Sequence, residues 1–310
     1  MTDTEIKTEP VTSSVWAAVD YRRKRPSLSA MLKLPGSWGI MVGGIITLIF
    51  IIVAVLAPVL APHDPYKQTL QHRLLPPAWV RGGDPSYLLG TDALGRDILS
   101  RLIYGSQISL LVGVSAVVGA GVLGVVLGIL SAYRGGWFDS IVQRITEFFQ
   151  AFPFLLLGIT VMAFLGQSVG NIIVVLILTR WVQFARVVRA QVLTLRHREY
   201  VEAAGTMGAG SLRTMVRHVL PNVLAPIIVI ATFSLATAIL GEASLSFLGV
   251  GVPPEVPTWG SMLSASQQYI YTDSWLSLWP GLVLFLLVIA VNLFGDGLRD
   301  LNDPKLRGRR

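Results

Sequence analysis

The chain has 310 residues, of which 53% are hydrophobic and 14% are charged, whereas a soluble domain usually carries about 25% charged residues. This composition excludes an ordinary soluble enzyme and indicates an integral membrane protein. The chain has no cysteine, which excludes disulfides, thiolate metal sites and cysteine nucleophiles. Its net charge of +7 does not indicate nucleic-acid binding, because the basic residues cluster at the ends of apolar runs, as is typical of membrane topology.

The N-terminal part is expected to be a cytoplasmic tail followed by a first membrane span. Residues 1–38 are polar and carry four consecutive basic residues, Arg22, Arg23, Lys24 and Arg25, just before the first apolar run. Residues 39–61 form an uncharged run of 23 residues, long enough to cross a hydrocarbon core of about 30 Å. A signal peptide has a shorter apolar core, of about 7–15 residues. We therefore predict a tail at 1–38 and one transmembrane domain over 39–310.

A polar loop rich in proline and glycine is predicted over residues 62–104, on the outer side of the membrane. It contains the motif LGTDALGRD at 89–97, followed by Ser100 and Arg101. The candidate functional residues of this motif are Thr91, Asp92, Gly95, Arg96 and Asp97. Asp92 with Arg96, and Asp97 with Arg101, are acid–base pairs spaced four apart, each worth a few tenths of a kcal/mol on a helix. The spacing predicts a stabilised helix entrance. His63 and His72 in this loop are interpreted as solvated rather than as metal ligands.

The second and third spans are predicted at residues 108–132 and 145–165. Small residues recur at every fourth position of the second span, at Ala120, Gly124 and Gly128, which predicts close packing of a neighbouring helix. A tight cytoplasmic turn separates the two spans. Pro153 lies inside the third span and is expected to bend it, because a proline frees a backbone carbonyl that surrounding helices can tolerate.

The fourth span is predicted from topology. Residues 171–179 are strongly apolar, but Arg180, Arg186 and Arg189 follow. Without a fourth span the basic C-terminal tail would lie outside, against the positive-inside tendency. Six spans place both termini inside, together with 20 of the 25 basic residues.

The longest polar interruption in the second half of the chain lies within a cytoplasmic loop predicted at residues 189–222. Residues 200–206 read as a short helix, and Gly205, Gly208 and Gly210 predict a sharp turn. A second helix is predicted over 212–220, with four apolar residues on one face, Leu212, Met215, Val216 and Val219. Pro221 stands where the next helix would begin. Two interpretations remain: a flat, small-residue docking knob for another protein, or an ordinary connector.

The last third of the chain holds one carboxylate in an apolar run. Residues 223–249 are predicted as the fifth span and contain Glu242, two residues before Ser244. A carboxylate there is expensive unless it faces a wet cavity or a partner, so an intramembrane site is the first interpretation and an interhelix hydrogen bond the second. Residues 250–274 are predicted as an outer re-entrant or surface segment. The sixth span, 276–294, has Trp275 and Trp279 at its outer interface.

Catalytic and nucleotide-binding motifs are missing from the sequence. A phosphate-binding loop needs a Gly-Lys pair followed by Ser or Thr, and none of the five lysines follows a glycine. The four histidines show no HExxH or other close ligand spacing. We therefore expect a non-enzymatic chain that hydrolyses no ATP alone, binds no metal and carries no cofactor.

Three segments of the sequence resemble one protein family. Glu202-Ala203-Ala204, then Gly208 and Leu220-Pro221, resemble the EAA loop of the membrane subunits of ATP-binding-cassette importers, with His218 where that pattern has an aliphatic residue. The motif LGTDxxGRDxxSR resembles the sequence before the second span in the dipeptide, oligopeptide and nickel branch of these importers. PPEVPTWGSM, which begins at residue 253, is similar to the same branch.

The resemblance implies an all-α, six-helix permease of the type I importer fold in the bacterial inner membrane, with both termini cytoplasmic. It implies half of a translocation pathway for di- and oligopeptides. The implied partners are a second permease subunit, two ATPase subunits that hold ATP and magnesium, an extracytoplasmic substrate-binding protein and membrane lipid, but no nucleic acid. The implied ATPase-coupling residues are Glu202, Ala203, Ala204, Gly208, Leu220 and Pro221, with Glu242 and Ser244 as pathway residues. Import of nickel or glutathione, and an ion-coupled secondary transporter using Glu242, remain the alternatives.

Overall fold

The computed structural model describes residues 37–207 and 209–302, and these residues form a bundle of helices. The predicted N-terminal tail lies outside the described residues except for its last two. The helices are α3 (Ser37–Val55), α4 (Ala57–Leu60), α5 (Ile98–Arg134), α6 (Gly136–Ala151), α7 (Phe154–Leu165), α8 (Val169–Leu195), α9 (Glu199–Thr206), α10 (Ser211–Thr214), α11 (Leu220–Phe247), α12 (Trp259–Ser266) and α13 (Trp275–Asn302). Short 3-10 turns stand at Leu70–His72 (η1) and Gln267–Tyr269 (η3), and a π-helical turn, η2, stands at Met215–Val219.

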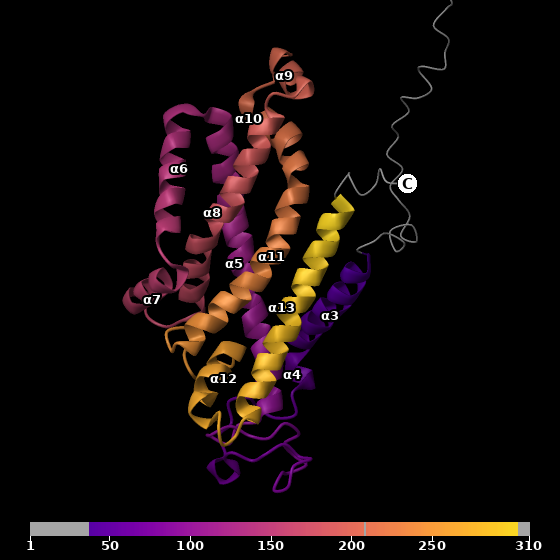
Figure 1. Cartoon of the computed structure of the whole chain (residues 1–310), viewed down its shortest axis with the longest axis vertical. Coiled ribbons are helices and arrows are strands. Elements are labelled where there is room, and N and C mark those ends of the chain that lie inside the picture. The colour runs from indigo at the N-terminus through magenta and orange to yellow at the C-terminus, as the bar shows by residue number, and fades with distance from the viewer. Residues whose placement is uncertain (1–36, 208, 303–310) are drawn as a thin grey trace, which may run out of the picture.

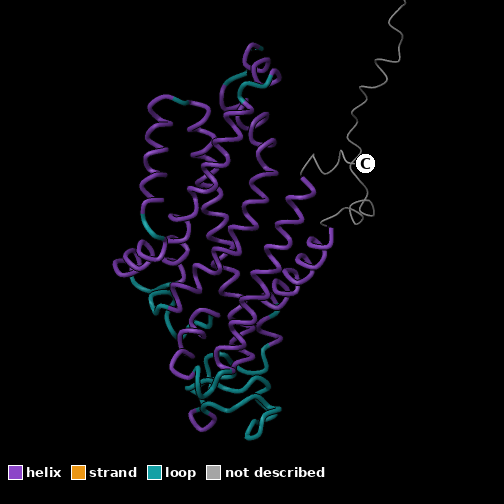
Figure 2. Tube along the Cα trace, viewed as in Figure 1, coloured by secondary structure: helices purple, strands orange, loops and turns teal. Residues whose placement is uncertain are grey.

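The bundle is organised around α5 and has two distinct ends (Figure 1). Helix α8 packs along α5, α13 packs along α3, and α11 contacts α5, α8 and α13. Helix α9 projects from one end, which we call the α9 end. The loop of residues 61–97 and helix α12 lie at the opposite end, which we call the loop end, where most of the non-helical chain gathers (Figure 2). The first turn of α3 and the last turn of α13 both point toward the α9 end of the bundle.

Five of the described helices are long and apolar enough to cross a membrane, and the pair α6 and α7 makes a sixth if it is counted as one broken span. This agrees with the predicted all-helical fold and its apolar runs. The third run departs from its prediction, because Pro153 does not bend one continuous helix. The chain breaks there, and α6 and α7 meet at 92°. Phe152 takes an extended backbone (φ −94°, ψ 132°), as the residue before a proline tends to do.

Two further boundaries differ from the predictions. The outer loop ends at residue 97 rather than 104, because α5 begins at Ile98 and continues for 37 residues. Helix α8 runs for 27 residues through Arg180, Arg186 and Arg189. The helix expected from the apolar residues 171–179 therefore continues through the three arginines, since straight-chain basic residues are good helix formers.

The predicted small-residue contact lies between α5 and α8. A Cβ atom on Gly124 would lie 2.4 Å from the Trp181 carbonyl oxygen, and one on Gly128 would lie 2.7 Å from the Ala185 carbonyl oxygen. Ala120 is fully buried. The backbones of the two helices therefore approach closely, which confirms the packing role of this stripe.

The α9 end of the bundle is tied together by apolar and ionic contacts. Seven buried side chains from α5, α8, η2 and α11 form one cluster there, namely Ile129, Ala132, Val188, Val192, Met215, Val219 and Val223. Asp139 at the start of α6 accepts two hydrogen bonds from Arg189 on α8, from Nε at 2.7 Å and from Nη2 at 2.6 Å. Such a two-pronged pair fixes direction as well as distance, so α6 and α8 keep one orientation at this end.

Candidate functional site

The tip of the α9 end is formed by an eight-residue helix that stands clear of the bundle (Figure 1). The predicted helix over 200–206 is therefore confirmed. The Glu202 side chain is 62% exposed, and its Oε1 lies 3.8 Å from His197 Nδ1. Met207 is 87% exposed. Ala203 is exposed as well, whereas Val201 is buried. Gly208 and the Ala204 side chain lie outside the described part of the chain. The tip thus presents a carboxylate beside small and apolar groups.

The four apolar residues predicted on one helix face after the tip are only partly buried. Met215 and Val219 are buried in the cluster at the α9 end, but Leu212 and Val216 are exposed, Leu212 by 72%. Residues three and four apart share a helix face, so this face lies at the edge of the bundle, with Met215 and Val219 packed inside and Leu212 and Val216 exposed.

The turn η2 explains how Pro221 fits into this segment. Helix α11 begins at Leu220 with Pro221 in its first turn, as predicted, and it follows the turn η2 so that the chain is helical from Ser211 to Phe247. The Leu220 N–H donates to the Met215 carbonyl, five residues back, which widens the helix by one residue just before the proline. A proline donates no backbone hydrogen bond, and a π turn absorbs such an irregularity. Leu220 is half-buried and Pro221 is exposed.

At the loop end, the LGTDALGRD motif folds the chain back on itself. Thr91 is fully buried; its Oγ1 donates to the His72 carbonyl and accepts from the Leu75 N–H. Asp92 accepts from the Leu94 and Arg96 N–H groups through Oδ1 and from Arg96 Nε at 2.7 Å through Oδ2. The predicted Asp92–Arg96 pair is therefore formed, but in a turn rather than on a helix.

The second predicted pair, Asp97 with Arg101, is replaced by other contacts. Asp97 is the N-cap of α5 and accepts from the Ser100 N–H at 2.9 Å and the Ser100 hydroxyl at 2.6 Å. A carboxylate at this position satisfies N–H groups that the helix leaves free. The buried Arg101 side chain turns instead toward Asp92, with Nε 3.8 Å from Oδ2, and donates to the Pro65 carbonyl.

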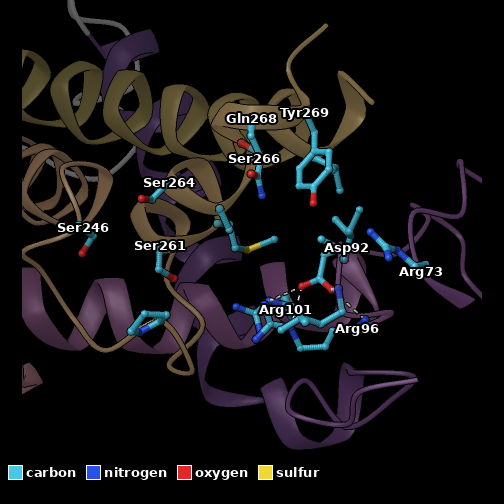
Figure 3. Close-up of a pocket in the computed structure, with 18 of the residues that line it drawn as sticks. Arg73, Asp92, Arg96, Arg101, Ser246, Ser261, Ser264, Ser266, Gln268 and Tyr269 are labelled. Atoms are coloured by element: carbon cyan, nitrogen blue, oxygen red, sulfur yellow. Dashed lines mark hydrogen bonds and ion pairs between the residues drawn. The ribbon is translucent and has the colours of Figure 1, made fainter. Parts of the chain in front are cut away.

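A cavity of about 570 Å³ lies between the motif, the end of α11 and α12 (Figure 3). Asp92, Arg96 and Arg101 lie together on one side of it, with Arg73 beside them, and Ser261, Ser264, Ser266, Gln268 and Tyr269 come from α12 and η3. Three of the charged lining residues are basic and one is acidic. The cavity therefore suits polar, anionic groups of a docking protein or solute.

Glu242 lies in the interior of the bundle and has no exposed surface. Its Oε1 accepts from the Ser246 hydroxyl at 2.8 Å, and its Oε2 accepts from the Ser109 hydroxyl on α5 at 3.4 Å. This is the geometry of the second sequence interpretation, a hydrogen bond between helices. Ser244 is half-buried, and its hydroxyl donates to the Leu240 carbonyl. A pathway role for either residue stays a prediction.

Several contacts had no signal in the sequence that would single them out. The sequence did not indicate that Ser109 would donate to Glu242, or that Asp139 would accept from Arg189. Arg180 was predicted only as an interruption of a span, but it reaches α11 and donates to Thr237. Its position inside an apolar run was the one feature of the sequence that could have indicated a special role. Among the described residues, no group of three histidines, aspartates or glutamates is placed to hold a metal ion.

Comparison with known proteins gives two family matches and a set of close relatives. Residues 124–308 match the model of the binding-protein-dependent transport system inner membrane component, and residues 36–77 match the N-terminal transmembrane domain of oligopeptide transport permease C. The chain is 43% identical over 269 residues to a di/tripeptide transport system permease protein DppC of Pseudomonas aeruginosa, which covers 87% of this chain and 89% of that protein. It is 44% identical over 269 residues to the dipeptide transport system permease protein DppC of Haemophilus influenzae, covering 87% and 91%.

A third relative, the dipeptide transport system permease protein DppC of Alkalihalophilus pseudofirmus, is 40% identical over 287 residues, covering 93% of this chain and 92% of that protein. These matches extend over both motifs and over the apolar helices that cross the bundle. The chain is thus a multi-pass inner-membrane protein, and it belongs to the family of binding-protein-dependent transport system inner membrane components.

Proposed function

We propose that this chain is the permease subunit of an ATP-driven importer for dipeptides and short oligopeptides, forming half of the transport route. The observation that carries the proposal is the 43–44% identity, over 87% of the chain, to permeases whose names specify dipeptide or di/tripeptide transport. The finer substrate choice belongs to the extracytoplasmic binding protein that delivers the solute. Import of nickel or glutathione by the same architecture is the nearest alternative.

The proposed topology has six crossings, with α6 and α7 together forming the third, as in a type I importer permease. The α9 end is cytoplasmic, and so are both termini. The positions of the start of α3 and the end of α13 on the side facing the α9 end support this arrangement (Figure 1). The loop end then faces outward, toward the binding protein.

We infer that the α9 tip is the surface on which the ATPase subunits act. Its exposed Glu202 and Met207 support docking, and the buried cluster beneath it joins η2 to α5 and α8. Movement of the tip would pass to these helices as a rigid rotation. In this proposal ATP and magnesium are held by the partner ATPases, a second permease completes the route, and this chain performs no catalysis.

The ion-coupled secondary transporter draws less support. It requires a titrating intramembrane group that reaches water, and Glu242 was its sole candidate. The Glu242 carboxylate has no exposed surface and is hydrogen-bonded to Ser109 and Ser246. Such surroundings favour a structural link between α5 and α11.

The test is co-purification of the tagged chain from its native membrane in mild detergent, with the associated proteins identified by mass spectrometry. We expect a second permease and ATPase chains. Glu202→Arg reverses a charge on the exposed tip and should release the ATPases while the second permease stays bound. The matched control is Glu255→Arg, which reverses an exposed charge at the loop end and should leave the ATPases in place. Recovery of the wild-type chain alone, under conditions that keep known complexes intact, would sink the proposal.

A further inference from the structure

Arg180 is a basic side chain in the middle of an apolar helix. It lies eleven residues after Val169, the first residue of α8, which corresponds to about 16 Å along the helix axis at 1.5 Å per residue. Its partner Thr237 lies ten residues before Phe247, the last residue of α11, or about 15 Å from the same end of the bundle. Both therefore lie about halfway through a hydrocarbon core of roughly 30 Å.

The Arg180 guanidinium reaches across α11 to an exposed face. Its Nη1 donates to the Thr237 hydroxyl at 2.7 Å, and its Nη2 donates to the Thr237 carbonyl at 2.6 Å. Gly241 makes room for this reach, since a Cβ there would lie 3.2 Å from Nη2. The Phe154 ring of α7 lies 5.7 Å from the guanidinium carbon. Thr237 and Leu240 are exposed on this face of α11.

The positive charge of Arg180 has no acidic partner among the residues that the structure describes. The carboxylate that follows on α11, Glu242, is fully buried and bonded to α5. Arg180 Nε is buried without a hydrogen-bond acceptor. An ionised side chain at this depth almost always faces the bundle interior or a water-filled cavity rather than lipid, so the exposed face at Thr237 is expected to line such a cavity.

A guanidinium carries five N–H donors and no acceptor, of which Thr237 takes two. Each terminal nitrogen thus keeps one hydrogen for a further acceptor. Either remaining N–H can donate to a carboxylate oxygen, and such charge-assisted bonds are about twice as strong as neutral ones. The contact with Thr237 keeps one hydrogen of each terminal nitrogen bonded when no anion is present, which favours release as well as binding.

We propose that Arg180 is a carboxylate-binding site on the transport route, at which the C-terminal carboxylate of a peptide is held during passage. The inference rests on the proposed function, and it adds a residue to which neither the motifs nor the family matches point. Thr237 is its positioning residue, because it orients the guanidinium toward the exposed face of α11.

The test uses the chain's lack of cysteine. Leu240→Cys places a thiol beside Gly241 on the exposed face, and Leu224→Cys places one on an exposed part of α11 about 24 Å nearer the α9 end. Each variant is purified with its partner subunits, and the wild-type complex reports their background labelling. Labelling rates are compared for an anionic reagent, 2-sulfonatoethyl methanethiosulfonate, and a cationic one, 2-(trimethylammonium)ethyl methanethiosulfonate.

We expect the ratio of anionic to cationic labelling rates to be about tenfold higher for Leu240→Cys than for Leu224→Cys, since the attraction of a nearby unpaired charge at the intermediate dielectric of a protein cavity is of that order. Adding Arg180→Gln to Leu240→Cys should remove the preference for the anionic reagent, and adding Arg180→Lys should keep most of it. Thr237→Val should weaken it without removing it. Alanyl-alanine should slow anionic labelling of the thiol at position 240, while its C-terminal amide should not.

Three results would overturn the inference. These are an unchanged reagent preference when Arg180→Gln is added, equal protection by the dipeptide and its amide, and failure of both charged reagents to reach the thiol at position 240 in the complex. A carboxylate of the second permease that already neutralises Arg180 would give the first result. If the proposed function is wrong, the co-purification already shows it, because the ATPase and second-permease chains are then absent from the purified sample.

Discussion

At the scale of single residues, the turn of the LGTDALGRD motif depends on Gly95. This residue has a positive φ of 72°, and a Cβ placed on it would lie 1.9 Å from the Thr69 carbonyl oxygen. No side chain fits there without moving the backbone of the loop. The motif therefore specifies a backbone path as well as a set of charges, and the walls of the loop-end cavity depend on that path.

Gly95→Ala is expected to destabilise the protein by about 3 kcal/mol or more, because it combines backbone strain with a steric clash. The control is Gly166→Ala, at φ 81° and ψ 169° with no atom within 4 Å of the added Cβ, which should carry the backbone strain alone, about 1–3 kcal/mol, without a steric clash. Thermal unfolding midpoints of the two purified variants in the same detergent measure the difference. Equal midpoints would show that the contact with Thr69 relaxes freely.

The charged motif shows how far residue patterns alone could go. The Asp92–Arg96 pair was predictable because its members are separated by four positions, and a single turn brings them together. Asp97 and Arg101 have the same spacing and do not pair. The difference arises because α5 begins between them, so Asp97 caps the helix and Arg101 points toward Asp92. Spacing does not reveal where a helix starts to within the few residues that decide such a contact.

At the scale of elements, the contact between α5 and α8 depends on glycines that face α8. Gly124→Ala should destabilise the bundle, since its Cβ would lie 2.4 Å from the Trp181 carbonyl oxygen and 2.5 Å from the Phe184 Cβ. The matched control is Gly121→Ala on the same helix, where the nearest atom would be 3.7 Å away and the alanine should improve helix propensity by up to about 1 kcal/mol. Detergent-solubilised thermal stability, read by size-exclusion chromatography after heating, should fall for the first variant only. A stable Gly124→Ala protein would contradict the close approach of the two helices.

The sequence predicted which long apolar runs form helices, but it did not predict where those helices break or change their hydrogen-bonding pattern. Composition and length located the segments that became α3, α5, α11 and α13, because about 20 apolar residues suffice to cross a membrane, whereas α8 was predicted from the positive-inside tendency. The 92° break at Pro153 and the π turn before Pro221 escaped prediction for a shared reason. A proline forbids one hydrogen bond, but only the packing around it decides whether the helix bends, breaks or widens.

At the scale of the whole molecule, the proposed topology places the two ends of the bundle on opposite sides of the membrane. Met207→Cys at the α9 tip and Tyr271→Cys at the loop end are both at exposed positions in a chain without cysteine. In spheroplasts, a membrane-impermeant maleimide should label the Tyr271→Cys variant at once and the Met207→Cys variant only after permeabilisation. The cysteine-free parent is the control. Labelling of both variants before permeabilisation, or the reverse order, would contradict the assignment.

The candidate site was foreseeable in parts of the molecule that carry motifs. The tip helix, the loop motif and the two alternatives for Glu242 followed from residue types and spacing. The cavity between the loop, α11 and α12 did not, because it joins residues more than 150 positions apart. The contact of Arg180 with Thr237, 57 positions apart, was missed as well, since only the arrangement of α8 against α11 brings them together.

Helix α5 runs unbroken for 37 residues, about 55 Å at 1.5 Å per residue, and contributes Arg101 to the loop-end cavity and Ile129 and Ala132 to the cluster under the α9 tip. In the proposed importer, one rigid element therefore belongs to both the surface for the binding protein and the surface for the ATPases. Coupling between two sites is thermodynamically reciprocal. If ATP binding weakens the hold on the binding protein by some factor, the docked binding protein weakens the hold on ATP by the same factor, so equilibrium titrations begun from opposite sides of the membrane must return one coupling free energy.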